Sequence, residues 1–324
     1  MQIIEHAAGR VPGPGLYAMP AAVYHADPAP APSLSSSIAK LLVDQSPAHA
    51  HAAHPRLGKV EDDAGDPTRP KEIGTAAHKL ILGRGAEVVA IDADDYRTAA
   101  AKAERARAYA EGHAPILRPD LATAERLAAA VADRIASMPD CAGFTTAPAE
   151  VIAIAQDRSG AWLRIMMDRV ELHDRYAIIW DVKTGEQSAA PHAIARRIVS
   201  MAMEVQAALY VRVIETLIPR LAGRVEFRWV FVENEAPHGV TVAAADNVML
   251  GIGGRKVAMA LHRWNAALRA DRWPAYPSGI VLPHYPEWAE RQWLEREEAE
   301  PDASVIDWDV RASPFRPLDM EPAA

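Results

Sequence analysis

Cysteine is almost absent from this 324-residue chain, which has Cys141 alone. A single thiol excludes disulfides within the chain, and it excludes zinc or iron–sulfur sites built from several cysteines. Long apolar runs are also missing, because no window approaches the ~18 apolar residues of a membrane helix. The first residues, MQIIEHAAGRVPGPG, hold no apolar run of signal-peptide length. These absences predict no membrane segment and favour a location in a reducing cytoplasm.

An excess of positive charge is the third absence. The net charge of −8 gives no general attraction to nucleic acids. It does not exclude them, because a local basic groove or bound metal ions can hold a phosphate backbone on an acidic protein. Half of the residues are hydrophobic, and 24% are charged. Such a chain is expected to be globular, with one large domain or two small ones.

The first half of the chain is expected to be mainly helical. Residues 1–32 are rich in Pro, Gly and Ala, and we interpret them as a flexible arm with a short extended piece near residues 16–24. A helix is expected after the serine cluster, where Ser33 or Ser35 can cap it. A loop is expected over residues 55–72. Further helices are predicted over residues 73–82, 93–111 and 120–137.

The second half changes character. Strands are predicted over residues 149–156, 161–171, 176–183, 224–234 and 239–245, with helices over 191–218 and 246–270. The order of elements predicts an α/β fold with a mixed central sheet flanked by helices. The domain is placed at residues 33–294, and residues 295–324 are interpreted as an acidic, flexible tail. The stretch GIGGRK lacks the spacing of a phosphate-binding loop and falls inside a predicted helix, so no ATPase is expected.

The stretch WDVKTG, residues 180–185, places an acid and a lysine on one side of a strand otherwise built for burial. The preceding strand carries Asp168, and the short turn between the strands makes them antiparallel neighbours. Asp168 can therefore lie close to Asp181. Two converging carboxylates repel unless a cation lies between them, and oxygen ligands suit Mg²⁺ or Mn²⁺. Lys183 adds a compact positive charge, and such a group can activate water and stabilise an attacked phosphodiester.

Each of these residues also has a plain structural interpretation. An isolated D-x-K is most often a surface salt bridge, but charges at the end of an apolar strand are costly without a task. The segment GTAAH places His78 one turn into a helix, where a histidine is often structural. Glu150 opens the first strand of the meander, where it can be solvated. Gln206 and Tyr210 are four residues apart and share one helix face, which can be plain helix surface.

Taken in order, GTAAH, Glu150, Asp168, WDVKT and QAALY resemble the RecE-type (exonuclease VIII) recombination nucleases of phages and prophages. These enzymes are members of the PD-(D/E)XK nuclease superfamily. The stretch YHADPAPAPSLSSSIAKLLVDQSPAHA is similar to the opening of that family, and RADRWPAYPSGIVLPHYPEWA is similar to its closing segment. The acid two residues before the lysine is often Glu in the superfamily and is Asp181 here.

The resemblance implies a role for each matching residue. Asp168 and Asp181 would bind the metal with the backbone carbonyl of Val182, and His78 would complete or orient this site. Lys183 would position the attacking water and stabilise the transition state. The remaining assignments are Glu150 near the metals, Gln206 and Tyr210 shaping the site against the substrate strand, and Thr184 bracing the loop after the strand.

Further residues are candidates for contact with DNA. Ser35 and Ser37 can donate hydrogen bonds to phosphate oxygens, although they can equally cap their helix. A DNA groove can also be lined by basic residues, although a solvated surface position is the plain alternative for each. These residues are Lys40, Lys71, Arg164, Arg196 and Arg197.

The resemblance implies a PD-(D/E)XK core and a Mg²⁺-dependent exodeoxyribonuclease. Family members degrade one strand of linear duplex DNA from its 5′ end, leave a 3′ overhang for a single-strand annealing protein, and tend to form homo-oligomeric rings. Two alternatives remain open. A structure- or site-specific endonuclease of the same superfamily would cut circular DNA. A non-catalytic scaffold for recombination would bind DNA ends without metal-dependent loss of mass.

Overall fold

The computed structural model describes residues 1–58 and 67–299. It divides into two compact units, Met1–Tyr276 and Pro277–Ala324. The first unit ends earlier than the predicted domain boundary at residue 294. Most of the predicted acidic tail, residues 300–324, lies outside the described residues, and residues 295–299 belong to helix α10 (Glu287–Ala299). No helix in the described part of the chain is both long and apolar enough to cross a membrane.

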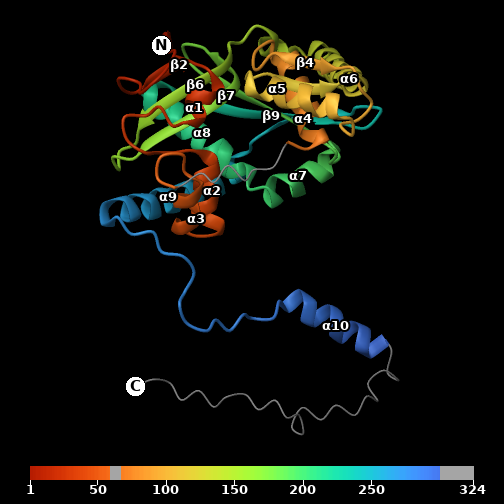
Figure 1. The fold of residues 1–324 in the computed structure, drawn as a ribbon. Coiled ribbons are helices and arrows are strands. Elements are labelled where there is room, and N and C mark those ends of the chain that lie inside the picture. The colour runs from red at the N-terminus through yellow and green to blue at the C-terminus, as the bar shows by residue number, and fades with distance from the viewer. Residues whose placement is uncertain (59–66, 300–324) are drawn as a thin grey trace, which may run out of the picture. The chain divides into compact units, whose positions relative to one another are not determined.

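An eight-stranded mixed sheet forms the centre of the first unit, which confirms the predicted fold class (Figure 1). The strand order is β1-β2-β6-β7-β8-β9-β10, with β3 paired to β7. The β1–β2, β3–β7 and β8–β9 pairs are parallel, and the other pairs are antiparallel. The strands are β1 (Ile3–Glu5), β2 (Gly15–Ala18), β3 (Ser33–Leu34), β6 (Ala149–Gln156), β7 (Trp162–Leu172), β8 (Ala177–Gly185), β9 (Val225–Glu233) and β10 (Val240–Ala244).

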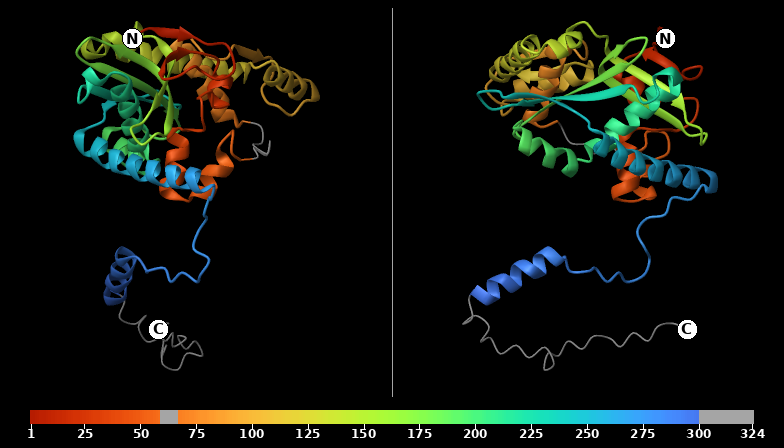
Figure 2. Two further views of the ribbon diagram at one scale, coloured as in Figure 1. Left: turned by 90° about the vertical axis from the view of Figure 1, so that its left-hand side faces the viewer. Right: turned by 180° about the vertical axis from the view of Figure 1, so that it is seen from behind.

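Helices cover both faces of this sheet (Figure 2). One face packs against α2 (Ser36–Asp44), α8 (Met203–Leu217) and α9 (Asn247–Ala270). The other face packs against α4 (Arg69–Leu82) and α6 (Arg118–Ala136). Strand β8 follows the alternation of a sheet covered on both sides, since Ile179 joins the first core while Trp180 and Val182 join the second.

Shorter elements complete the first unit. They are α1 (Ala21–His25), α3 (Pro47–Ala53), α5 (Ala99–Ala110), α7 (Pro191–Ser200), the 3₁₀ turns η1 (Pro139–Thr145) and η2 (Pro219–Leu221), and a separate parallel pair of strands, β4 (Val88–Ile91) and β5 (Ala114–Leu117).

The N-terminal segment is part of the sheet, so the prediction of a flexible arm over residues 1–32 is wrong. Strand β2 pairs with β6 in antiparallel register, and Leu16 and Tyr17 are buried. The strand is only four residues long and lies between Pro- and Gly-rich loops. A segment so short shows little periodicity, so its sequence alone favours a loop.

The predicted long helix over residues 191–218 is interrupted. It forms α7 and α8, separated at Ala202, whose φ of 47° is left-handed. The apolar positions continue on both sides of the break, so their periodicity gives no sign of it. The predicted loop over residues 55–72 is also too long, because α4 begins at Arg69 with a proline in its first turn.

Gly253 explains why GIGGRK lies inside a helix. A Cβ at this position of α9 would collide with the backbone carbonyl oxygen of Glu204 in α8, so glycine permits the close packing of the two helices. Gly254 has open space around its Cβ position.

We expect Gly253→Ala to lower the free energy of unfolding by about 1–3 kcal/mol. Gly254→Ala should raise it by up to about 1 kcal/mol, because alanine favours helix. Urea unfolding of the two variants measures this, and equal stabilities would contradict the packing argument.

Candidate active site

Two acidic residues face each other across strands β7 and β8. The register pairs Arg169 with Trp180 and Val170 with Ile179. One further step along this register brings Asp168 opposite Asp181. Directly opposed residues in an antiparallel pair share a sheet face and have close side chains. Both carboxylates are buried, with exposed fractions of 8% and 3%.

The strand ladder is irregular next to this pair. Strands β6 and β7 pair Ala149 with Arg169 and Val151 with Met167, while the intervening pair is missing from the register. The residue skipped in β6 is Glu150, whose φ of 51° is left-handed and is uncommon for a residue with a Cβ. Such strained positions cluster at functional sites. Here the irregularity lies directly opposite Asp168.

Asp168 is held by donors from two elements. Its Oδ2 accepts a 2.6 Å hydrogen bond from the Val182 N–H and lies 3.1 Å from Nε2 of His78 in α4. In a regular strand, the N–H and C=O of one residue point toward the same neighbouring strand. The Val182 carbonyl therefore faces β7 as well. These contacts orient the carboxylate and bring a backbone oxygen to its side of β8.

Asp181 is held from the opposite side by the helix and by its own strand. Its Oδ1 accepts a 2.7 Å hydrogen bond from Nε2 of Gln206 in α8. Its Oδ2 lies 2.5 Å from the Lys183 ammonium nitrogen. The same Oδ2 is buried and accepts no hydrogen bond of regular geometry within the described part of the chain. Its one close partner is the Lys183 ammonium, so a divalent cation at this oxygen would compete with the lysine.

The two carboxyl groups have opposite pKa shifts. Burial raises the pKa of Asp168, but the His78 imidazole, Lys183 and the Val182 N–H outweigh burial and leave that pKa below its usual range. Burial also raises the pKa of Asp181, and there it prevails, because the Asp168 charge adds to it and Lys183 only partly opposes it. The pair thus favours one charge over two unless a further cation is present.

The charges of this pair also act on His78. Burial acts to lower the pKa of its imidazole, but Asp168, then Glu150 and Asp181, raise that pKa overall. A charged imidazole at Asp168 would be one more donor that keeps this carboxylate ionised and fixed in place.

Side chains supply only part of the ligands that a hard divalent cation needs. Among residues 1–58 and 67–299, no group of three or more His, Cys, Asp or Glu side chains is arranged to hold a metal ion. Two carboxylates and a backbone carbonyl remain, and Mg²⁺ is commonly held by one or two carboxylates with water and substrate oxygens. The buried Oδ2 of Asp181 is consistent with such a site. Asp168, Asp181 and the Val182 carbonyl are therefore the residues that would hold the ion.

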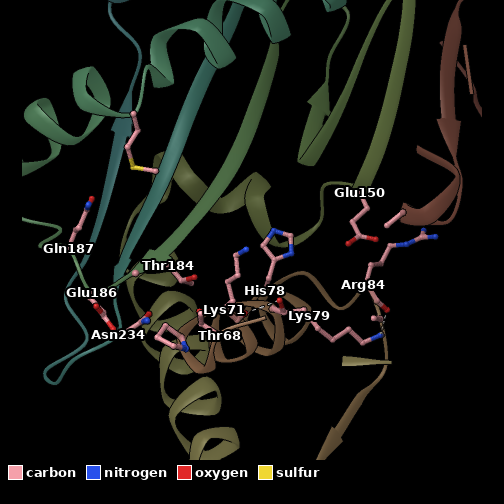
Figure 3. Close-up of a pocket in the computed structure, with 18 of the residues that line it drawn as sticks. Thr68, Lys71, His78, Lys79, Arg84, Glu150, Thr184, Glu186, Gln187 and Asn234 are labelled. Atoms are coloured by element: carbon pink, nitrogen blue, oxygen red, sulfur yellow. Dashed lines mark hydrogen bonds between the residues drawn. The ribbon is translucent and has the colours of Figure 1, made fainter. Parts of the chain in front are cut away.

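A pocket of about 700 Å³ lies next to His78, the partner of Asp168, and Asp168, Asp181 and Lys183 are not among the residues that line it (Figure 3). His78 and Glu150 line it, as does Thr184 at the end of β8. Gly74 allows α4 to approach Thr184, because a Cβ there would lie 3.0 Å from the threonine hydroxyl. The pocket also has basic residues around it: Lys71, Lys79, Arg84 and Arg197. This wall is positively charged although the whole chain is acidic.

Tyr210 lies on α8 and contacts strand β7 next to the site. Its hydroxyl donates a 2.9 Å hydrogen bond to the Met166 carbonyl of β7, and its side chain is buried. Burial raises the pKa of this hydroxyl well above its usual range. Tyr210 thus fixes α8 against the strand that carries Asp168.

Three predicted DNA-contact residues lie elsewhere. Ser35 is buried and caps α2 by accepting a hydrogen bond from the Ile38 N–H, and Ser37 is exposed on that helix outside the pocket. The expectation that Arg164 lines a DNA groove is corrected. Arg164 is 4% exposed, and it donates to the Ser33 carbonyl at 2.6 Å, so it stabilises the packing of β3 against β7.

Two basic pocket residues escaped the sequence analysis. Lys79 and Arg84 flank the C-terminal end of α4, on the same wall as His78 (Figure 3). Lys79 is engaged with Glu87 at 2.9 Å. The available signal was their position directly after the GTAAH motif, since one face of α4 carries the motif to the pocket.

Comparison with known proteins supports a nuclease fold. The model of the PD-(D/E)XK nuclease superfamily matches residues 34–270. A crystal structure of a "Putative exonuclease" from Eubacterium rectale is similar in fold, with a TM-score of 0.50 at 11% identity, covering 79% of this chain and 91% of that one. The crystal structure of SSO0001 aligns at a TM-score of 0.23 and 11% identity, over 58% of this chain and 84% of that one. No curated protein matches the chain. The family match spans most of the sequence and includes Asp168, Asp181 and Lys183, so the chain belongs to the PD-(D/E)XK nuclease superfamily.

Proposed function

We propose that this protein is a Mg²⁺-dependent exodeoxyribonuclease that degrades one strand of linear duplex DNA in the 5′-to-3′ direction. The observation that carries the proposal is the opposed pair Asp168 and Asp181 with Lys183 beside it. The fold similarity to a protein named as an exonuclease agrees with it. Mn²⁺ has similar ligand preferences and is expected to substitute.

Each residue of the site has a task in phosphodiester hydrolysis. Asp168 and Asp181 would hold a divalent ion, which would supply Lewis acidity toward the attacked phosphate. Lys183 extends from the same strand as Asp181, so its ammonium can orient the attacking water and stabilise the added negative charge. His78 and Gln206 keep the two carboxylates in position through the contacts described above. Glu150, at the pocket wall near His78, is suited to hold water or the ion's outer ligands.

The product and partners follow from this reaction. Removal of one strand from its 5′ end leaves a 3′ overhang, which a single-strand annealing protein would bind for recombination. A homo-oligomeric ring around the duplex would keep the enzyme on its substrate. The buried Cys141 thiol is free, which suits a cytoplasmic protein of a bacterial host.

The polarity of digestion has a direct test. Linear duplexes carry a fluorescent label at the 5′ end of one strand or, in a second substrate, at its 3′ end. With Mg²⁺, the proposal predicts early release of the 5′ label as a short product and late release of the 3′ label from shortened strands. The reverse order would contradict the proposed polarity. Internal cuts without end dependence would favour an endonuclease.

A further inference from the structure

Arg197 is a buried cation on the wall of the candidate active-site pocket. It belongs to α7 and is 8% exposed. Its Nη2 donates one long hydrogen bond, 3.4 Å, to the Thr184 carbonyl. Its guanidinium carbon lies 5.1 Å over the Phe231 ring. Its Nε and Nη1 are buried, and neither has a hydrogen-bond acceptor in the described parts of the chain.

Two other buried arginines show how unusual this is. Arg164 donates to the Ser33 carbonyl and hydroxyl and lies 3.4 Å from the Asp27 carboxylate. Arg169 donates to three backbone carbonyls at 2.7–3.2 Å. Each of these has one buried nitrogen without an acceptor, Nε, whereas Arg197 has two. Burial lowers the pKa of the Arg197 guanidinium, and no carboxylate of the described residues offsets this effect.

A buried cation with too few acceptors destabilises a fold, so a ligand that supplies acceptors would stabilise it. The place and the chemistry of Arg197 indicate which one. It touches Thr184, three residues beyond Asp181, which is about 10 Å along an extended strand. Gly185 leaves room there, because a Cβ would lie 3.2 Å from the Arg197 Nη2. A guanidinium that lines a pocket and has two unpaired N–H groups is suited to phosphate oxygens, provided that the side chain turns to bring these groups to the pocket surface.

We propose that Arg197 binds a backbone phosphate of the substrate strand, one or two nucleotides from the scissile phosphodiester. This inference rests on the proposed nuclease function. It selects, from the basic residues that the sequence offers for a DNA groove, one residue on α7 and assigns it a phosphate of the substrate strand. The phosphate would supply the acceptors that the Nε and Nη1 groups lack.

The variant Arg197→Met tests the proposal, because it separates a role in DNA binding, measured by Kd, from a role in stability, measured by Tm. Binding of a fluorescent linear duplex is measured by anisotropy in EDTA, where nothing is digested. We expect Kd to rise roughly ten- to hundredfold, the effect of a lost charged hydrogen bond. The slope of log K against log salt should fall by about one. The Tm should stay unchanged or rise, because methionine removes a buried cation without acceptors. A purely structural arginine would instead lower the Tm and leave Kd unchanged.

Arg134→Met is the matched control, because it removes the same charge from an exposed position on α6. It is expected to bind DNA as the wild type does. An unchanged Kd for Arg197→Met would overturn the proposal, whatever its Tm.

A second measurement uses the wild-type protein and so does not depend on the folding of a variant. A series of duplexes is used, and each duplex has a single uncharged methylphosphonate in place of a different phosphate near the 5′ end. One position should weaken wild-type binding by a factor similar to that of Arg197→Met, and should have no further effect on the variant. Absence of any sensitive position would overturn the inference. If the wild type binds DNA through Arg197 but digests nothing with Mg²⁺, the proposed activity fails while the phosphate contact stands.

Discussion

Asp181→Asn is expected to reduce the rate of DNA digestion by on the order of 10³-fold or more, because several kcal/mol of transition-state stabilisation depend on the ion that its carboxylate would hold. Asparagine keeps the size of the side chain, and its oxygen can still accept the hydrogen bond that Gln206 donates to Asp181 Oδ1. The substitution removes the negative charge opposite Asp168. It should therefore preserve the fold while removing the preference of the site for a divalent cation.

Release of nucleotides from linear duplex at saturating Mg²⁺ measures this loss. The Tm with and without Mg²⁺ provides an independent readout, since a ligand that binds only the folded state raises Tm. Mg²⁺ should stabilise the wild type and have little effect on Asp181→Asn. Asp94→Asn, an exposed acid far along the chain, serves as the charge control. Digestion by Asp181→Asn at the wild-type rate would show that the site is wrongly assigned.

Lys183→Met should lose digestion by roughly 10²–10³-fold, the cost of removing one donor to a developing oxyanion. Its effect on metal binding should be the opposite of that of Asp181→Asn. The Lys183 ammonium lies 2.5 Å from Asp181 Oδ2, so its removal takes away a cation that competes for this oxygen. Without metal the variant should be less stable, because a buried carboxylate loses its partner.

The predicted pattern for Lys183→Met is therefore a lower Tm in EDTA, a larger Tm increase on addition of Mg²⁺, and little digestion. Lys102→Met, at an exposed position of α5, should match the wild type in all three measurements. A Lys183→Met protein that digests DNA normally would remove the lysine from the mechanism. A Lys183→Met protein that loses digestion and whose Tm does not rise with Mg²⁺ would show that the lysine supports the metal site itself.

The pairing of the two acids could be predicted because it depends on local rules. The turn after β7 is short, so β7 and β8 must be antiparallel neighbours, and the alternation of side chains then places Asp168 and Asp181 on one face. The spacing of Gln206 and Tyr210 likewise puts both on the face of α8 that meets these strands. Residues fixed by one strand pair or one helix face are within reach of sequence analysis.

Other features depend on contacts between distant segments. The left-handed conformation of Glu150 arises where β6 leaves the regular ladder, and its sequence context shows nothing of it. The break at Ala202 interrupts a periodic pattern that continues on both sides. Arg197 has the sequence context of a solvated helix residue, and only the packing of α7 against β8 and β9 buries it. Tertiary packing decided each of these.

The central claim is that Asp168, Asp181 and Lys183 form a metal-dependent site that digests DNA from its ends. Linear and nicked-circular duplexes with labelled strands, incubated with Mg²⁺ and separately with EDTA, test it most directly. The account predicts progressive loss of the linear substrate alone, abolished by EDTA and absent in Asp181→Asn. Cutting of intact strands in the circle would indicate an endonuclease at the same site. Binding of ends without digestion of either substrate would contradict the claim.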